Sequence, residues 1–71
     1  MWHTLKHVAE NQMLDPIEFR KFALAQANRF GIDHFHMVNT FHVDDLLKAY
    51  RESQTPEQLE AQRQAAISRR K

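Results

Sequence analysis

The chain has 71 residues, with ten Lys and Arg against nine Asp and Glu, and no Cys. This length allows one domain with a thin core, because a chain of this size buries only about 60% of its unfolded surface on folding. The absence of Cys excludes disulfide bonds. The near balance of charge argues against a dedicated nucleic-acid binder, whose affinity comes largely from neutralised phosphates.

Neither a secretion signal nor a membrane-spanning segment is visible. The first ten residues, MWHTLKHVAE, are polar and lack the apolar region of a signal peptide. No apolar run approaches the roughly 20 residues that a spanning helix needs. We therefore expect a cytoplasmic protein without membrane contact, which the lack of Cys also fits.

The first predicted element is a helix over residues 3–13. Trp2, Leu5, Val8 and Ala9 recur at helical spacing, which gives this segment one apolar face.

The second predicted helix covers residues 16–30 and has the clearest boundaries. Asp15-Pro16-Ile17-Glu18 is a start signal, because Asp15 can cap free backbone N–H groups and Pro16 suits the first helical position. Gly31, the only glycine, is typical of a left-handed residue that ends a helix. The apolar side chains cover an unusually wide arc, interrupted by Arg20 and Gln26, so we expect a central helix that contacts neighbours on two sides.

Residues 33–43 carry two competing patterns. Phe35, Met37, Phe41 and Val43 fit a period of two, which would allow a hairpin around Asn39-Thr40. No other strand is indicated, and an isolated hairpin is marginal in water. We therefore favour a short helical turn or an irregular segment here.

Two further helices complete the predicted fold. Asp44 or Asp45 can cap a helix over residues 44–53, and Thr55-Pro56 repeats the earlier start signal for a helix over residues 56–69. This last helix is polar, so we expect the C-terminal segment, residues 56–71, to dock loosely on the rest of the fold. The segment ends in a basic tail, and positive charges there are favourable next to the C-terminus of a helix. The fold class is all-α: a single domain over residues 1–71, a compact bundle of about four short helices. Its expected core contains Phe19, Phe22, Phe30, Leu46, Leu47 and Tyr50.

The five histidines are the most unusual feature of the composition. His34, His36 and His42 are the first candidates if any metal binds, since neutral imidazole is a common metal ligand. A fourth ligand at suitable spacing is missing, however, so we expect no metal and no cofactor. One glycine is too few for a phosphate-binding loop, and no nucleophile motif is present. We expect a protein that is not an enzyme.

The remaining features favour a small protein-interaction module, an adaptor or regulator. Aromatic side chains on a rigid helical surface are typical of interface hot spots. The partner would be an unidentified protein, with a homodimer as the expected assembly because the chain is too short to bury its apolar arc well. Its size and composition are typical of phage and plasmid accessory proteins that dock on host factors. The candidate contact residues are Trp2, Phe19, Phe22, Phe30, Phe35 and Phe41.

DNA binding is the alternative. Residues 23–41 resemble a degenerate helix-turn-helix, with Ala27 four residues before Gly31 and apolar residues on both sides of the glycine. The second helix of this motif would lack Arg, Lys and Gln to contact bases or phosphates. The candidate nucleic-acid contacts are His36, Arg63, Arg69, Arg70 and Lys71.

Overall fold

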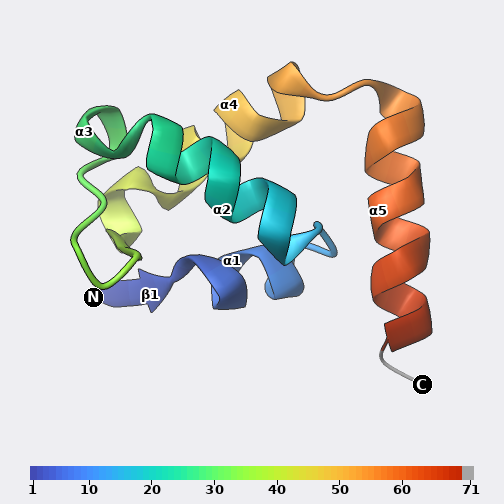
Figure 1. Ribbon diagram of the computed structural model, residues 1–71, viewed down its shortest axis with the longest axis horizontal. Helices are drawn as coiled ribbons and strands as arrows, with labels where there is room; N and C mark the ends of the chain where they lie inside the picture. The colour runs from blue at the N-terminus through green and yellow to red at the C-terminus, as the bar shows by residue number, and fades with distance from the viewer. Residues whose placement is uncertain (70–71) are drawn as a thin grey trace.

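Five helices and two short strands follow one another in the computed structural model, which describes residues 1–69 (Figure 1). The fold is mainly helical, as predicted, with a small two-stranded sheet in addition. None of the helices is long and apolar enough to cross a membrane, over the same residues. The elements are β1 (Trp2–Thr4), α1 (Leu5–Asn11), α2 (Pro16–Ala25), α3 (Ala27–Phe30), β2 (Met37–Asn39), α4 (Thr40–Ser53) and α5 (Pro56–Arg69).

The predicted helix boundaries at Asp15, Gly31 and Thr55 are confirmed. Asp15 Oδ1 accepts a hydrogen bond from Ile17 N at 2.9 Å, which caps α2. Thr55 and Gln58 form a reciprocal capping box, with Gln58 N donating to Thr55 Oγ1 at 3.1 Å and Thr55 N to Gln58 Oε1 at 2.8 Å. Gly31 has φ 61°, the left-handed conformation expected after a helix.

The single helix predicted over residues 16–30 is wrong in one respect. It divides at Gln26, where φ −125° takes the backbone out of the helical region. A short helix, α3, follows at an altered direction (Figure 1). Phe30 at its end is nevertheless buried in the core, so the break changes the path of the chain without exposing this ring.

Residues 33–43 do not form the local hairpin, and they match the favoured prediction only in part. Residues 33–36 are irregular and residues 40–43 are helical, but a strand lies between them. Met37–Asn39 is a strand, and it pairs antiparallel with Trp2–Thr4, with Trp2 opposite Asn39 and Thr4 opposite Met37. Asp33 Oδ1 accepts hydrogen bonds from the backbone N atoms of Phe35 and Met37, at 2.9 and 3.0 Å. This side chain holds a turn that leads the chain into β2.

The pairing also moves the starts of two predicted helices. The first helix begins at Leu5 instead of residue 3, with Thr4 Oγ1 accepting from His7 N. The helix predicted from residue 44 begins at Thr40, because the Asn39 side chain accepts from Phe41 N at 3.1 Å and caps it.

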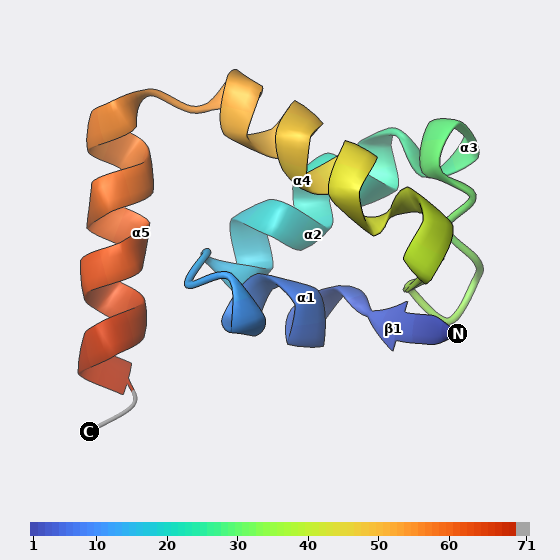
Figure 2. The ribbon, with the colours of Figure 1, turned by 180° about the vertical axis from the view of Figure 1, so that it is seen from behind.

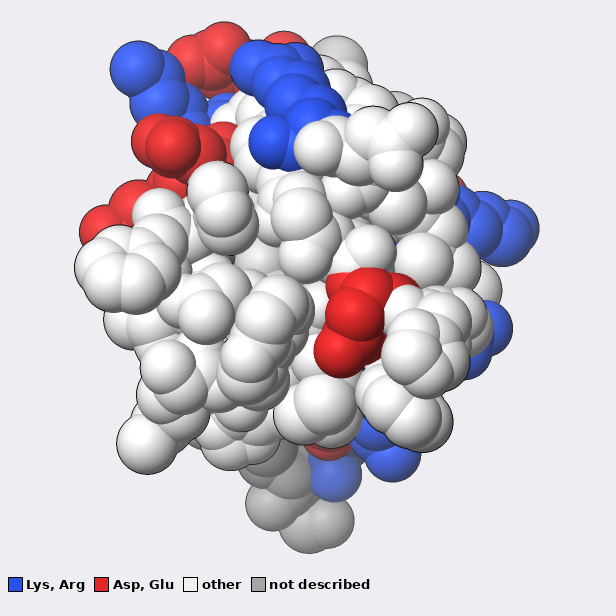
Figure 3. All heavy atoms as spheres, turned by 90° about the vertical axis from the view of Figure 1, so that its left-hand side faces the viewer, with Lys and Arg blue, Asp and Glu red and all other residues white. Residues whose placement is uncertain are grey.

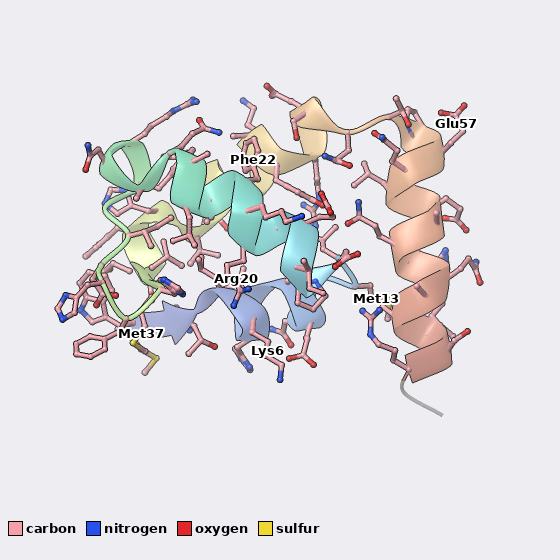
Figure 4. The ribbon with its side chains drawn as sticks, viewed as in Figure 1. Lys6, Met13, Arg20, Phe22, Met37 and Glu57 are labelled. Atoms are coloured by element: carbon pink, nitrogen blue, oxygen red, sulfur yellow. The ribbon has the colours of Figure 1, made fainter. Side chains whose placement is uncertain are left out.

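The core lies where α2 crosses between α1 and α4, as Figures 1 and 2 show from opposite sides. Phe19 and Tyr50 are almost fully buried there and meet edge to face, with ring centroids 5.2 Å apart. Five of the six predicted core residues are buried, and Phe22 is half-buried against Tyr50. Figure 4 shows Phe22 on the side of α2 that faces α4.

Helix α5 stands at one side of the molecule and docks through a polar residue (Figure 2). Gln62 Oε1 accepts from Tyr50 Oη at 2.9 Å and from Asp15 N at 3.0 Å, while Gln62 Nε2 donates to Gln54 Oε1 at 3.2 Å. Ala66, one turn further along, is buried. The polar sequence of α5 therefore contains the group that attaches it to the rest of the fold.

Candidate functional site

Large apolar side chains are exposed mainly at one end of the molecule. Among residues 1–69, five such side chains are exposed. Ile17 lies at the start of α2, and the other four lie on or beside the two strands. These four are Met1 at 85% exposure, Trp2 at 47%, Phe35 at 69% and Phe41 at 87%, and together we call them the aromatic patch.

The small sheet gathers this patch from two distant parts of the sequence. Thr40 donates from both its backbone N and its Oγ1 to the carbonyl oxygen of Met1, at 2.9 and 3.0 Å. At the other end of the sheet, Leu5 N donates to the carbonyl oxygen of His36 at 3.1 Å. The strand pairing therefore holds Met1 and Trp2 against the segment that carries Phe35 and Phe41.

Strand alternation separates a buried face of the sheet from an outer face. Val38, at the centre of β2, has no exposed surface. Its neighbours Met37 and Asn39 point to the opposite face, as does Trp2 across from Asn39. Figure 4 shows Met37 at this outer side, away from α2. Because Trp2 pairs with Asn39, its ring lies on the outer face of the sheet. Val38, one residue before Asn39, lies on the buried face.

Charged side chains are sparse at this end of the molecule. Figure 3 views it directly and shows a broad uncharged surface, with Lys, Arg, Asp and Glu mainly at the margins and one acidic group within it. Removing water from such a surface costs less than removing it from ionised groups. The patch can therefore be covered by another apolar surface with few charged groups removed from water.

The six aromatic residues proposed from the sequence as partner contacts fall into two groups. Trp2, Phe35 and Phe41 are exposed and belong to the patch. Phe19 and Phe30 are buried in the core, at 0% and 3% exposure, and Phe22 is packed against it. Their assignment to a contact surface is corrected, because in this structure they have little or no surface to offer. Met1 was not among the candidates, and only its strand pairing places it in the patch.

The histidines near the patch interact with protein groups. The His34 ring lies against the Phe35 ring, with centroids 4.1 Å apart, and His42 lies next to Gly31. His3 Nε2 is 2.8 Å from Thr40 Oγ1. Over residues 1–69, no group of three or more His, Asp or Glu side chains is arranged to hold a metal ion. His34, His36 and His42 are thus near in sequence without forming a metal-ligand set.

The residues of the DNA-binding alternative do not form one surface. Residues 33–39, which would supply the second helix of a helix-turn-helix, are a turn and a strand. His36 precedes β2, whereas Arg63 and Arg69 lie on α5 at the other side of the molecule (Figure 1). Arg63 is also paired with Glu60 at 3.6 Å. Arg70 and Lys71 lie outside the described residues.

Among residues 1–69, the side chain whose pKa clearly departs from its ordinary value lies in the core. Burial raises the pKa of the Tyr50 phenol above its ordinary value of 10.0, and the hydrogen bond to Gln62 partly opposes this rise. Tyr50 is 1% exposed and its hydroxyl donates to Gln62, so it is placed to stabilise the fold and has no access to a substrate.

Comparisons of the chain with protein-family models, with curated proteins and with solved structures found no match.

Proposed function

We propose that this protein is a non-enzymatic interaction module, an adaptor or regulator of the cytoplasm that binds a partner protein through the aromatic patch. The observation that carries the proposal is that four of the five large apolar side chains exposed among residues 1–69 lie on or beside the two paired strands: Met1, Trp2, Phe35 and Phe41. Scattered apolar residues on a surface need no explanation, whereas a contiguous apolar patch is typical of an interaction site.

The chemistry of the patch indicates the kind of partner. Trp is among the residues most enriched at hot spots, and large aromatic rings dominate the energy of interfaces. The uncharged surroundings favour an apolar groove on the partner over a charged one. The resemblance in size and composition to phage and plasmid accessory proteins supports a host factor as that partner.

Self-association through the same patch is part of the proposal. A symmetric dimer places a surface against its own copy, so a strongly charged surface would repel itself. The aromatic patch has no such obstacle, because charged groups are sparse on it. We therefore propose a homodimer in the absence of the partner.

A capture experiment with matched variants tests the proposal. Immobilised wild-type protein and the double variant Phe35→Ser/Phe41→Ser are incubated with lysate of the source cells, and the retained proteins are quantified. Ala65→Ser is the control, since Ala65 is exposed on α5 and lies outside both the patch and the other clefts of the surface. We expect a defined protein to be retained by wild type and control, and to be reduced about tenfold or more by the double variant. Equal retention by the double variant and the wild type, or equal loss in both variants, would contradict the proposal.

A further inference from the structure

A second surface feature lies away from the patch. An open cleft of about 380 Å³ is formed by α1, the start of α2 and the end of α5. Its lining residues are Lys6, Asp15, Pro16, Ile17, Arg20 and Arg69. No residue of the aromatic patch lines it, and α5 is on the side of the molecule opposite to β1 (Figure 1).

Three cations from three different helices line this cleft. Lys6 comes from α1, Arg20 from α2 and Arg69 from α5. Figure 4 shows Arg20 extending from α2 over α1, with Lys6 on α1 beneath it. Among residues 1–69, no ion pair or side-chain hydrogen bond joins these three cations to another residue, whereas Lys21 and Arg63 are each paired with a Glu.

The single acidic group in the lining is already engaged. Asp15 Oδ1 accepts hydrogen bonds from the backbone N atoms of Ile17 and Glu18, at 2.9 and 3.4 Å. Its negative charge is directed at the N-terminus of α2, where it is stabilised by the helix dipole. Three cations against one carboxylate leave the cleft with an excess of positive charge.

The cleft also has an apolar component. Ile17 is 60% exposed beside Pro16, and it precedes Arg20 by three residues, so both side chains lie on one face of α2. The cleft therefore combines an exposed aliphatic side chain with cations around it.

The docking of α5 is what brings Arg69 to this place. Gln62 accepts from the backbone N of Asp15 at 3.0 Å, which places α5 beside the start of α2. Ala66 and Arg69 follow Gln62 by four and seven residues, so all three share one helix face. Arg69, which lines the cleft, is therefore on the same face of α5 as the residues that contact the rest of the fold.

We propose that this cleft binds an acidic peptide segment of a partner protein, with an apolar side chain of that segment seated against Ile17. Charge complementarity carries the assignment, because three unpaired cations favour a ligand with several carboxylates. The exposed aliphatic side chain favours a ligand with apolar groups between the acids. The volume is at the lower end of the range for ligand pockets, which suits a few side chains of an extended segment.

Fluorescence polarisation of the 71-residue chain with two labelled peptides tests this site. One peptide alternates Glu and Leu, and the other has Gln in place of every Glu. We expect the acidic peptide to bind and the neutral peptide to bind at least about tenfold more weakly, with the difference shrinking as salt is added. Equal binding of the two peptides would overturn the proposal.

Matched variants locate the binding. Arg20→Gln should weaken the acidic peptide about threefold, and Lys6→Gln/Arg20→Gln about tenfold. The control is Lys21→Gln, which removes the same charge from the neighbouring position but from a residue paired with Glu18, outside the cleft. Ile17→Ser should also weaken binding. An equal loss in Arg20→Gln and Lys21→Gln, or an unchanged affinity in Ile17→Ser, would overturn the site.

The cleft and the aromatic patch are tested separately. Phe35→Ser/Phe41→Ser should bind the acidic peptide as the wild type does, because neither residue lines the cleft. A loss of peptide binding in that variant would overturn the assignment to the cleft.

Discussion

Phe19 is fully buried and meets Tyr50 edge to face, whereas Phe41 is 87% exposed at the start of α4. The two residues therefore contribute to different properties of the protein. Burial of an aromatic ring stabilises the folded state, and an exposed ring leaves its apolar surface available for binding.

We predict that alanine substitutions at these two positions change the free energy of unfolding by very different amounts. Phe19→Ala should lower the free energy of unfolding by about 3–5 kcal/mol, because it leaves a cavity in a thin core. Phe41→Ala should change it by less than about 0.5 kcal/mol, since the ring is mostly in solvent. Urea unfolding followed by circular dichroism measures both. Similar losses in the two variants would contradict the core described above.

From the raised pKa of the Tyr50 phenol, we predict that the protein becomes less stable at alkaline pH. The pKa of this phenol in the folded state is raised above 10.0, mainly by burial, so the unfolded chain loses this proton first as the pH rises. The stabilisation is fully present below pH 10 and is lost as the pH rises through the folded pKa. Tyr50→Phe should lack this contribution to the pH dependence.

The same variant has an effect at neutral pH. Tyr50→Phe should cost about 0.5–1.5 kcal/mol, because it removes the hydrogen bond to Gln62. Unfolding free energies measured from pH 7 to pH 11, on wild type and variant in parallel, test both statements. Identical pH profiles for the two proteins would show that Tyr50 does not titrate as described.

At the scale of elements, Gly31 is the residue whose conformation ends α3. Its φ of 61° is costly for a residue with a Cβ, although a Cβ would meet the His42 ring at an ordinary 3.5 Å. Gly31→Ala should therefore lower the unfolding free energy by about 1–2 kcal/mol through backbone strain alone. Gly31→Asn is the matched control, since Asn tolerates this conformation better, and it should lose less. If Gly31→Ala lowers the unfolding free energy less than Gly31→Asn does, backbone strain is not the cause, and the loss comes from packing of the new side chain against His42.

Helix boundaries were predictable where the signal is local. Asp15, Gly31 and Thr55 act on backbone groups a few residues away, so their roles can be recognised in the sequence. The sheet was not predictable in this way, because Trp2 pairs with Asn39 across most of the chain. Three-residue strands are too short to show a period, and the N-terminal one was therefore assigned to a helix.

At the scale of the whole molecule, the candidate site was only partly predictable. Sequence reasoning singled out Trp2, Phe35 and Phe41, but it could not separate them from Phe19 and Phe30. Which aromatic rings are exposed depends on how helices cross and which strands pair, and periodicity within one helix does not contain that information. The cleft around Arg20 likewise depends on the docking of α5.

The assembly prediction belongs to this scale. Light scattering at micromolar concentration should give about twice the chain mass of 8.5 kDa for the wild type. Phe35→Ser/Phe41→Ser should give the mass of one chain, because the patch is the proposed dimer surface. A wild-type protein that stays at one chain mass, or a variant that remains a dimer, would contradict self-association through the patch.

Site-specific photocrosslinking in the source cells tests the aromatic patch most directly. A photoreactive phenylalanine analogue replaces Phe41, or in the control replaces Ala65, which is exposed on α5 away from the patch. If a partner binds the aromatic patch, the analogue at position 41 gives a crosslinked product that the analogue at position 65 does not give. No product from position 41, or the same products from both positions, would contradict it.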